Sequence, residues 1–354
     1  MAIKFIYDNA HKIGGDRNRI TIGGESAGSI SSSFQMLNPD TNWMVSQAIL
    51  QSGMPNAACG DWCMDVRPHI RMVCDALKDP SKCISAGRSD EQIVDQLRVV
   101  KDSQQIYHQL EGHGVSVSIN YKDGKFFRTD PYQAIRDRSF KSDVNMLMGF
   151  TSFEGSLEKD SYPHKFNKGN FMSAYQEWPN DLYNEATRLS GDKIELLARR
   201  KFHQLACDNK FQPLFDNIDD REAIAIALDI YGDIGFRVSG IVHARFYLEA
   251  QQKQSLDNKV FVYNFDTHEH HDGQLVGAQH ADELKYHHAW SQDGWKPWQH
   301  EIETFMINSW SNFIKYGDPS YNIDGDEQVW QKFDGNELHM EIENSHKHKA
   351  IRND

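Results

Sequence analysis

The sequence predicts an α/β fold, in which strands and helices alternate along the chain. Three short segments rich in β-branched or aromatic residues are predicted to be buried strands, at 19–24, 143–150 and 259–265. Apolar residues at helical spacing follow these strands, most clearly over 299–319. Gly317 occupies the position after that helix where a left-handed backbone is common, and a proline lies just beyond.

The first half of the chain is expected to begin with a helix that a Gly-Gly pair stops and to continue with the first strand. Ser26 and a second helix follow that strand directly, and a proline ends the helix. The further elements expected in this half are a strand or helix–strand join at 46–54, a helix at 90–100 and a hairpin turn at 121–127.

The second half is expected to be mainly helical over 171–254, before the strand at 259–265. Within it, one apolar stripe is formed by Val238, Ile241, Val242 and Phe246. The late helix presents a second face, made of Ile302, Phe305, Met306, Ser309, Phe313 and Ile314. The last residues, from Glu343 onward, are expected to fray.

Composition places the chain among ordinary globular proteins. It has 354 residues, 39% of them hydrophobic and 25% charged, and a net charge of −13. The negative charge argues against a nucleic-acid partner, and no apolar run is long enough to span a membrane. The start of the chain lacks the pattern of a signal peptide. No repeat or linker divides the sequence, so 1–354 is expected to be a single domain.

Four of the five cysteines fall in one short segment: Cys59, Cys63, Cys74 and Cys83, with Cys207 alone. The four residues allow two disulfides in any of three connectivities, and reduced thiols remain an equal alternative. Zinc fits less well, because no C-x2-C pair is present.

Ser26 lies in Gly24-Glu25-Ser26-Ala27-Gly28, which fits the G-x-S-x-G nucleophile elbow. There a serine occupies a sharp, strained strand-to-helix turn, and the glycines leave room because they lack a Cβ. A serine nucleophile needs a base, and the base needs an orienting carboxylate. In chain order, Glu154 follows the strand at 143–150 and His280 follows the strand at 259–265.

The sequence resembles the carboxylesterase type B and cholinesterase-like family of α/β-hydrolases. The matching blocks follow the family's order, cover about residues 3–320, and are FIYDNAHKIGGDRNRITIGGESAGS, AILQSGMPNA, YKDGKFFRTDPYQAI, GFTSFEGS, HADE and SWSNFIKYGDPS. The resemblance implies an α/β-hydrolase fold, with a mostly parallel sheet flanked by helices.

The resemblance also implies roles for individual residues. Ser26 matches the nucleophile, Glu154 the triad acid and His280 the general base. The N–H of Ala27 matches an oxyanion donor. Glu25 and Ser52 match positions that line the site, and Glu283 matches a buried supporting carboxylate. The implied activity is hydrolysis of small carboxylic esters through an acyl-enzyme, with no cofactor and no metal.

One departure from the family is large. The family places a His-Gly-Gly loop, which supplies further oxyanion N–H groups, well upstream of the serine, and this sequence contains neither that loop nor the first strands of the sheet. We therefore expect an N-terminally incomplete sequence, whose leader, if any, lies in the missing part. Family resemblance favours a secreted or endoplasmic-reticulum location, and the sequence does not indicate the oligomeric state.

Several alternatives remain beside this interpretation. The cluster His268, His270 and His271 is expected to be a polar loop rather than a metal site. Trp290, Trp295 and Trp298 are expected to pack in loops rather than to form a ligand platform. Small residues before the Asp-Gly turn predict a broad ester range and do not support acetylcholinesterase activity. The alternative functions are a catalytically inactive adhesion or binding protein and an inactive fragment.

Overall fold

The structure is a computed structural model of the whole chain. The residues that it describes are 2–55, 71, 73–75, 77, 85–100, 103–112, 126, 134–135, 137–158, 219–257, 259–267, 271–272, 275–288, 292–323, 326–335, 339–343 and 349–351. The chain forms two compact units, one made of Met1–Gly60 with Pro131–Asp354 and the other of Asp61–Asp130. Compact units are not in themselves separate domains, so the single domain over 1–354 stays a prediction.

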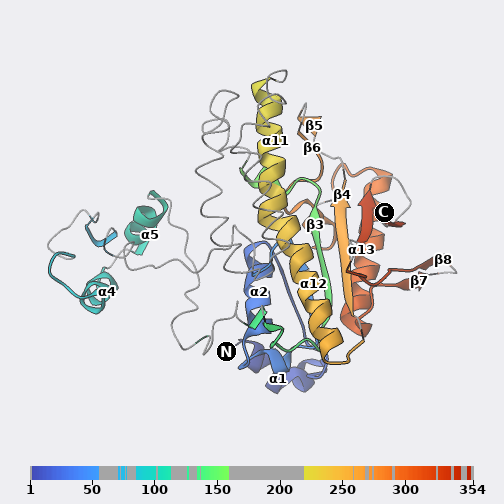
Figure 1. Cartoon of the computed structure of the whole chain (residues 1–354), viewed down its shortest axis with the longest axis horizontal. Coiled ribbons are helices and arrows are strands. Elements are labelled where there is room, and N and C mark those ends of the chain that lie inside the picture. The colour runs from blue at the N-terminus through green and yellow to red at the C-terminus, as the bar shows by residue number, and fades with distance from the viewer. Residues whose placement is uncertain are drawn as a thin grey trace. The chain divides into compact units, whose positions relative to one another are not determined.

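A six-stranded sheet forms the centre of the first unit (Figure 1). Its strands, in spatial order, are β1 (Thr21–Glu25), β2 (Gln47–Gln51), β3 (Asn145–Thr151), β4 (Val260–Asp266), β9 (His339–Glu343) and β10 (Lys349–Ile351). All neighbours pair in parallel except β9 and β10. The observed sheet confirms the predicted α/β class, and the three predicted strands form at β1, β3 and β4.

Helices and short strands precede the first sheet strand of this unit or connect one sheet strand to the next. They are α1 (Ala2–Asn9), η1 (Ala10–Ile13), α2 (Ala27–Leu37), η2 (Asn42–Met44), η5 (Glu154–Glu158), α11 (Asp220–Gly232), η6 (Asp233–Arg237), α12 (Val238–Lys253), β5 (His271–Asp272), β6 (Leu275–Val276), η7 (Asp282–Tyr286), α13 (Pro297–Tyr316), β7 (Tyr321–Ile323) and β8 (Asp326–Gln328). The segment η6 is one π-helical turn between α11 and α12.

Helices α12 and α13 pack on opposite faces of the sheet. A Cβ on Gly240 of α12 would meet the ring of Phe150 at 1.9 Å, so this helix lies directly on the face that Phe150 shares with the other even-numbered residues of β3. On the other face, Trp310 of α13 packs edge-on against Tyr263, with ring centroids 5.2 Å apart. The central strands β2, β3 and β4 are therefore buried on both sides, as their apolar residues predict.

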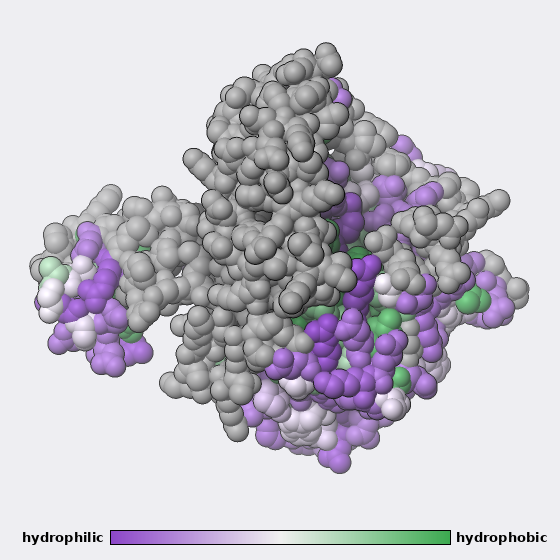
Figure 2. All heavy atoms as spheres, in the orientation of Figure 1, coloured by the Kyte–Doolittle hydropathy of each residue, from purple (hydrophilic) through white to green (hydrophobic). Residues whose placement is uncertain are grey.

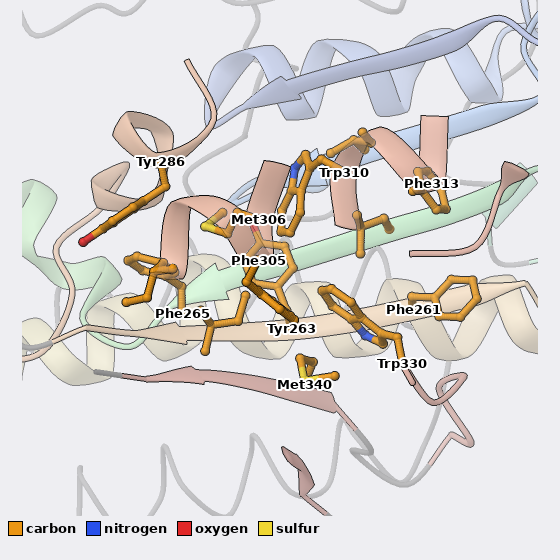
Figure 3. Close-up of a cluster of buried hydrophobic side chains, with 14 of the residues drawn as sticks. Phe261, Tyr263, Phe265, Tyr286, Phe305, Met306, Trp310, Phe313, Trp330 and Met340 are labelled. Atoms are coloured by element: carbon orange, nitrogen blue, oxygen red, sulfur yellow. The ribbon is translucent and has the colours of Figure 1, made fainter. Parts of the chain in front are cut away.

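A large hydrophobic core lies between α13 and the sheet (Figure 3). Aromatic residues dominate it, among them Phe261, Tyr263 and Phe265 from β4. Trp295 and Trp298 pack against this core, so these two tryptophans are packed side chains, as expected. Trp298 lies in the first turn of α13 and not in a loop. Trp290 lies outside the described residues.

Two predicted apolar faces differ from the structure at their margins. Ile314 of α13 is 46% exposed, whereas the other five predicted members of that face are buried. Trp310, which is not among the predicted members, is also buried. Val238, at the start of α12, is 40% exposed. Gly317 has the predicted left-handed backbone, with φ of 76°. Helical spacing thus identified the buried faces, but not where each face ends.

The unit Asp61–Asp130 contains two described helices, α4 (Asp90–Arg98) and α5 (Ser103–Gly112). Ser89 and Gln92 form a capping box at the start of α4. Cys74 is buried with Leu77 and Ile93. The other four cysteines lie outside the described residues, so disulfide pairing stays a prediction. The hairpin expected at 121–127 also lies outside them, apart from Phe126.

The described part of the face drawn in Figure 2 is mainly hydrophilic, with a few hydrophobic residues between the polar ones. Among the described helices, none has the length and apolar character that crossing a membrane requires.

Candidate active site

Ser26 occupies a sharp turn between β1 and α2. Its φ and ψ are 52° and −120°, a conformation that costs free energy for any residue with a Cβ. The Ser26 N–H donates to the carbonyl of Gln51 at 2.8 Å, which continues the ladder between β1 and β2 past the strand end. This contact holds the strained serine at the carboxyl edge of the sheet, where ligands of open α/β sheets bind.

The two glycines of the elbow differ in what they make possible. A Cβ on Gly24 would lie 2.4 Å from the backbone carbon of Gly28. A Cβ on Gly28 would meet none of the described atoms within 4 Å. The absence of a Cβ at Gly24 therefore allows β1 and the start of α2 to lie close together. The space beside Gly28 is open in the described part of the chain.

Glu154 begins η5, directly after β3, and its side chain is fully buried. Its Oε1 accepts hydrogen bonds from the hydroxyl of Ser52 at 2.6 Å and from the N–H of Thr151 at 2.8 Å. Ser52 follows β2 with a positive φ of 50°. Since the carboxyl ends of parallel neighbours meet at one edge, Ser26, Ser52 and Glu154 are brought to the same edge by three consecutive strands.

His280 lies in the segment between β6 and η7, and its Nδ1 is 2.5 Å from Oε2 of Glu154. A carboxylate can only accept, so this contact places the proton of the neutral imidazole on Nδ1. Phe236, in the π-helical turn, packs against the imidazole with ring centroids 4.9 Å apart. The ring of His280 is thus held in one tautomer and one orientation.

Backbone contacts join the histidine segment to the acid segment. The hydroxyl of Ser152 accepts from the N–H of Ala278 at 2.8 Å, and the hydroxyl of Ser156 accepts from the N–H of His280 at 2.8 Å. The N–H of Phe153 donates to the carbonyl of Ala278 at 2.9 Å. These bonds fix the distance between the two segments independently of the side-chain contact.

The second nitrogen of His280, Nε2, lies 3.1 Å from Oε1 of Glu25. Both atoms are buried, and neither has a hydrogen-bond partner of good geometry among the described residues. Burial by itself lowers the pKa of His280, but the hydrogen bond and charge of Glu154, with the charge of Glu25, outweigh it and raise this pKa. Burial raises the pKa of Glu25.

Glu283, in η7, belongs to a second buried network of hydrogen bonds, separate from the contact between His280 and Glu154. Its Oε1 accepts from Nε2 of Gln51 at 3.1 Å and from the hydroxyl of Tyr263 at 3.3 Å. Burial, and then the nearby charge of Glu154, raise the pKa of Glu283 to about 8. Gln51 also lies 3.0 Å from Nε2 of His287, whose pKa burial lowers to about 3, so that this ring is neutral.

Ala27 is the first residue of α2, so its N–H is among those that a helix leaves without an intrahelical partner. The residues expected at the site thus occupy one edge of the sheet, and Ser52 contacts Glu154. Sequence reasoning missed Ser152, Ser156 and Phe236. The first two flank Glu154 in TSFEGS, where short hydroxyl side chains beside an acid are a usable signal.

No group of three or more metal-binding side chains occurs within the described ranges. His268 and His270 lie outside those ranges, and of His271 only the backbone, in β5, is described. The expectation of a polar loop at this cluster therefore stays a prediction.

The mostly parallel sheet, with helices on both faces and a serine elbow at its carboxyl edge, defines an α/β-hydrolase fold. A family model described as "Carboxylesterase family" matches residues 1–354. The chain therefore belongs to the carboxylesterase family.

Three curated relatives illustrate this membership. Carboxylesterase 5A of Canis lupus familiaris is 23% identical, over 97% of this chain and 56% of that protein. Bile salt-activated lipase of Homo sapiens is 24% identical, over 94% of this chain and 43% of that protein. Acetylcholinesterase of Electrophorus electricus is 24% identical, over 92% and 54% respectively. The chain thus spans about half the length of the curated relatives it matches.

Proposed function

We propose that this chain carries the catalytic machinery of a serine carboxylic-ester hydrolase, with Ser26 as nucleophile, His280 as base and Glu154 as the acid that orients it. The observation that carries the proposal is the contact between Nδ1 of His280 and Oε2 of Glu154. It leaves Nε2 unprotonated and buried at the edge where the strained serine lies, and Oε1 of Glu25, 3.1 Å away, forms no hydrogen bond with it. A nitrogen in this state is suited to accept a hydroxyl proton.

In the proposed reaction, Ser26 Oγ attacks the ester carbonyl while its proton passes to Nε2 of His280. The N–H of Ala27 donates to the oxyanion of the tetrahedral intermediate. His280 then returns the proton to the leaving alcohol, and an acyl-enzyme remains. Water attacks this acyl group in the second half, with His280 again taking the proton and then giving it back to Ser26.

In this scheme Glu154 supports His280, and Ser52 supports Glu154. The carboxylate of Glu154 stabilises the imidazolium that forms in each half-reaction. Ser52 and the N–H of Thr151 hold the other carboxylate oxygen, so the acid keeps its position. The raised pKa of His280 agrees with a cation stabilised by carboxylates.

The proposed substrates are small carboxylic esters. The names of two relatives, a carboxylesterase and an acetylcholinesterase, support the ester class, and the small size comes from the family resemblance of the sequence. The segment EGHGVSVSIN, on which we base the broad acyl range, lies outside the described residues apart from its first two, so that range is a proposal from sequence.

Steady-state hydrolysis of a chromogenic ester such as p-nitrophenyl acetate tests the proposal. Ser26→Ala is expected to abolish turnover. Ser31→Ala is the matched control, because that hydroxyl lies in helix α2 and, among the described residues, its hydrogen bond goes to the Ala27 carbonyl. Equal turnover by wild type and Ser26→Ala would contradict the proposal. Absence of turnover in a folded wild-type chain would favour the non-catalytic alternative.

A further inference from the structure

A cavity of about 380 Å³ lies at the opposite ends of the strands from the serine elbow. Gln47, Asn145 and Lys259 line it, and each stands at or just before the first residue of β2, β3 or β4. Ser26 and Glu154 instead follow the last residues of β1 and β3. The cavity is therefore separate from the proposed active site, and its volume lies within the range of small-molecule pockets.

The walls of this cavity are cationic, although the chain carries a net charge of −13. The charged residues that line it are Arg17, Arg19, Lys141, Lys259 and Lys315, with Asp143 as the single carboxylate. Such a reversal of sign within an acidic protein concentrates anions at one place.

Internal partners neutralise only part of this charge. Arg19 pairs with Asp16 at 3.1 Å, and Lys259 lies 3.7 Å from Asp143. In the described part of the chain, Arg17, Lys141 and Lys315 form no ion pair with a carboxylate. Lys141 instead donates to the carbonyl of Val45 at 2.9 Å. Arg17 and Lys315 are thus the two lining cations whose charge neither an ion pair nor a side-chain hydrogen bond engages in the described part of the chain.

Contacts across the cavity join the backbone segments that form its walls. A guanidinium nitrogen of Arg19 donates to the carbonyl of Lys315 at 3.1 Å. Nε2 of Gln47 donates to the carbonyl of Phe313 at 2.7 Å. These bonds join the end of α13 to the segment before β1 and to the start of β2, so the backbone positions that carry Arg19 and Lys315 are fixed relative to each other.

Aromatic side chains form another part of the lining. Trp43 is 51% exposed and Tyr316 is 72% exposed, which is unusual for side chains of this size. Tyr7 supports Trp43 in an edge-on contact at 4.9 Å and lies beneath Arg17, whose guanidinium carbon is 5.5 Å from the ring centroid. Exposed rings beside cations suit a ligand that joins a flat ring to an anionic group.

We infer that this cavity binds a small phosphate-bearing ligand with an aromatic ring, of the nucleoside monophosphate class. The phosphate contacts Arg17 and Lys315, because guanidinium and ammonium groups are the side chains that bind phosphate in charge-assisted hydrogen bonds. The ring stacks on the exposed aromatic residues. The inference is independent of the proposed esterase activity, because it uses none of the residues at the carboxyl edge.

Isothermal titration calorimetry with adenosine monophosphate tests the inference on the full chain. Wild type is expected to bind one equivalent, and Arg17→Ala and Lys315→Ala are each expected to weaken binding about tenfold, the loss of one charge-assisted hydrogen bond. Lys4→Ala is the matched control, since it removes an exposed cation of α1 whose partner is Asp8 and which does not line the cavity. Thermal melting of each variant checks that it is folded.

Adenosine without phosphate is expected not to bind, and added salt is expected to weaken the binding of the monophosphate. Absence of binding by folded wild type would overturn the inference, as would equal weakening by Lys4→Ala. Pyrophosphate binding as tightly as the nucleotide would overturn the role of the rings. If the protein binds heparin but does not bind adenosine monophosphate, the inference is also overturned, because surface charge alone can hold a long polyanion.

Discussion

Glu25 Oε1 lies 3.1 Å from Nε2 of His280, the imidazole nitrogen that does not contact Glu154. The residue directly before the proposed nucleophile therefore places a second carboxylate beside the base. Glu154 contacts one nitrogen of the ring, and Glu25 lies near the other. A protonated imidazole in this position is stabilised from both sides, and its pKa depends on both acids.

Replacing Glu25 tests this dependence. Glu25→Gln removes a negative charge next to Nε2, so the pKa of His280 is expected to fall. Because the proposed base acts when neutral, the acid limb of the pH profile of kcat/KM should move to lower pH, by up to about one unit. An acid limb that stays in place, or moves to higher pH, would contradict the electrostatic role of Glu25.

Glu154→Gln tests the orienting role of the acid. The amide keeps the size of the side chain but no longer selects the Nδ1–H tautomer, so kcat is expected to drop about 10⁴-fold, the loss known for the equivalent acid-to-amide change in a serine protease triad. Ser52→Ala removes one hydrogen bond to the same carboxylate and should cost far less. Steady-state kinetics on both variants gives the comparison, and equal losses would count against the assignment of Glu154 as the triad acid.

The two elbow glycines predict opposite outcomes for the same substitution. Gly24→Ala forces a Cβ against the backbone of Gly28, and we expect a loss of about 1–3 kcal/mol in the free energy of unfolding, or more. Gly28→Ala meets no described atom and should be tolerated. Urea denaturation of both variants measures the difference. A destabilised Gly28→Ala together with an unaffected Gly24→Ala would show that the elbow packs differently.

Glu283 predicts how stability depends on pH. Its pKa is about 8 when folded, well above that of an exposed glutamate, so the folded state holds a proton that the unfolded state releases. Stability from this group is present in acid and is lost as pH rises toward 8, by at most about 1.4 kcal/mol per pH unit. Glu283→Gln should flatten the fall of Tm between pH 5 and 8. An unchanged slope would contradict a protonated Glu283.

The elements that could be predicted from the sequence are those in which several consecutive residues favour the same secondary structure. The strands at 143–150 and 259–265 form at Asn145–Thr151 and Val260–Asp266, because runs of apolar residues suit a strand buried on both faces. Strand β9 was missed, since its alternating HMEIE pattern is short and partly charged. It forms because β4 offers it a parallel partner, which is information that local sequence does not contain. Residues 349–351, expected to fray, pair with β9 for the same reason.

The chain order of Ser26, Glu154 and His280 was enough to nominate them, because each follows a recognisable strand. Their supporting contacts were not predictable in this way. Ser52, Ser156 and Phe236 reach Glu154 or His280 only because segments far apart in the chain meet at one edge of the sheet. The π-helical turn that carries Phe236 also has no signature in the helical spacing of 235–251.

Covalent labelling with a fluorophosphonate probe, followed by mass spectrometry of the digested protein, tests the central proposal most directly. A serine activated by an adjacent imidazole attacks phosphorus at a rate that an ordinary hydroxyl does not reach. We predict a single adduct on the peptide that contains Ser26, absent in Ser26→Ala, strongly slowed in Glu154→Gln and retained in Ser31→Ala. A folded wild-type chain that takes up no probe, or takes it up at a different serine, would contradict the account.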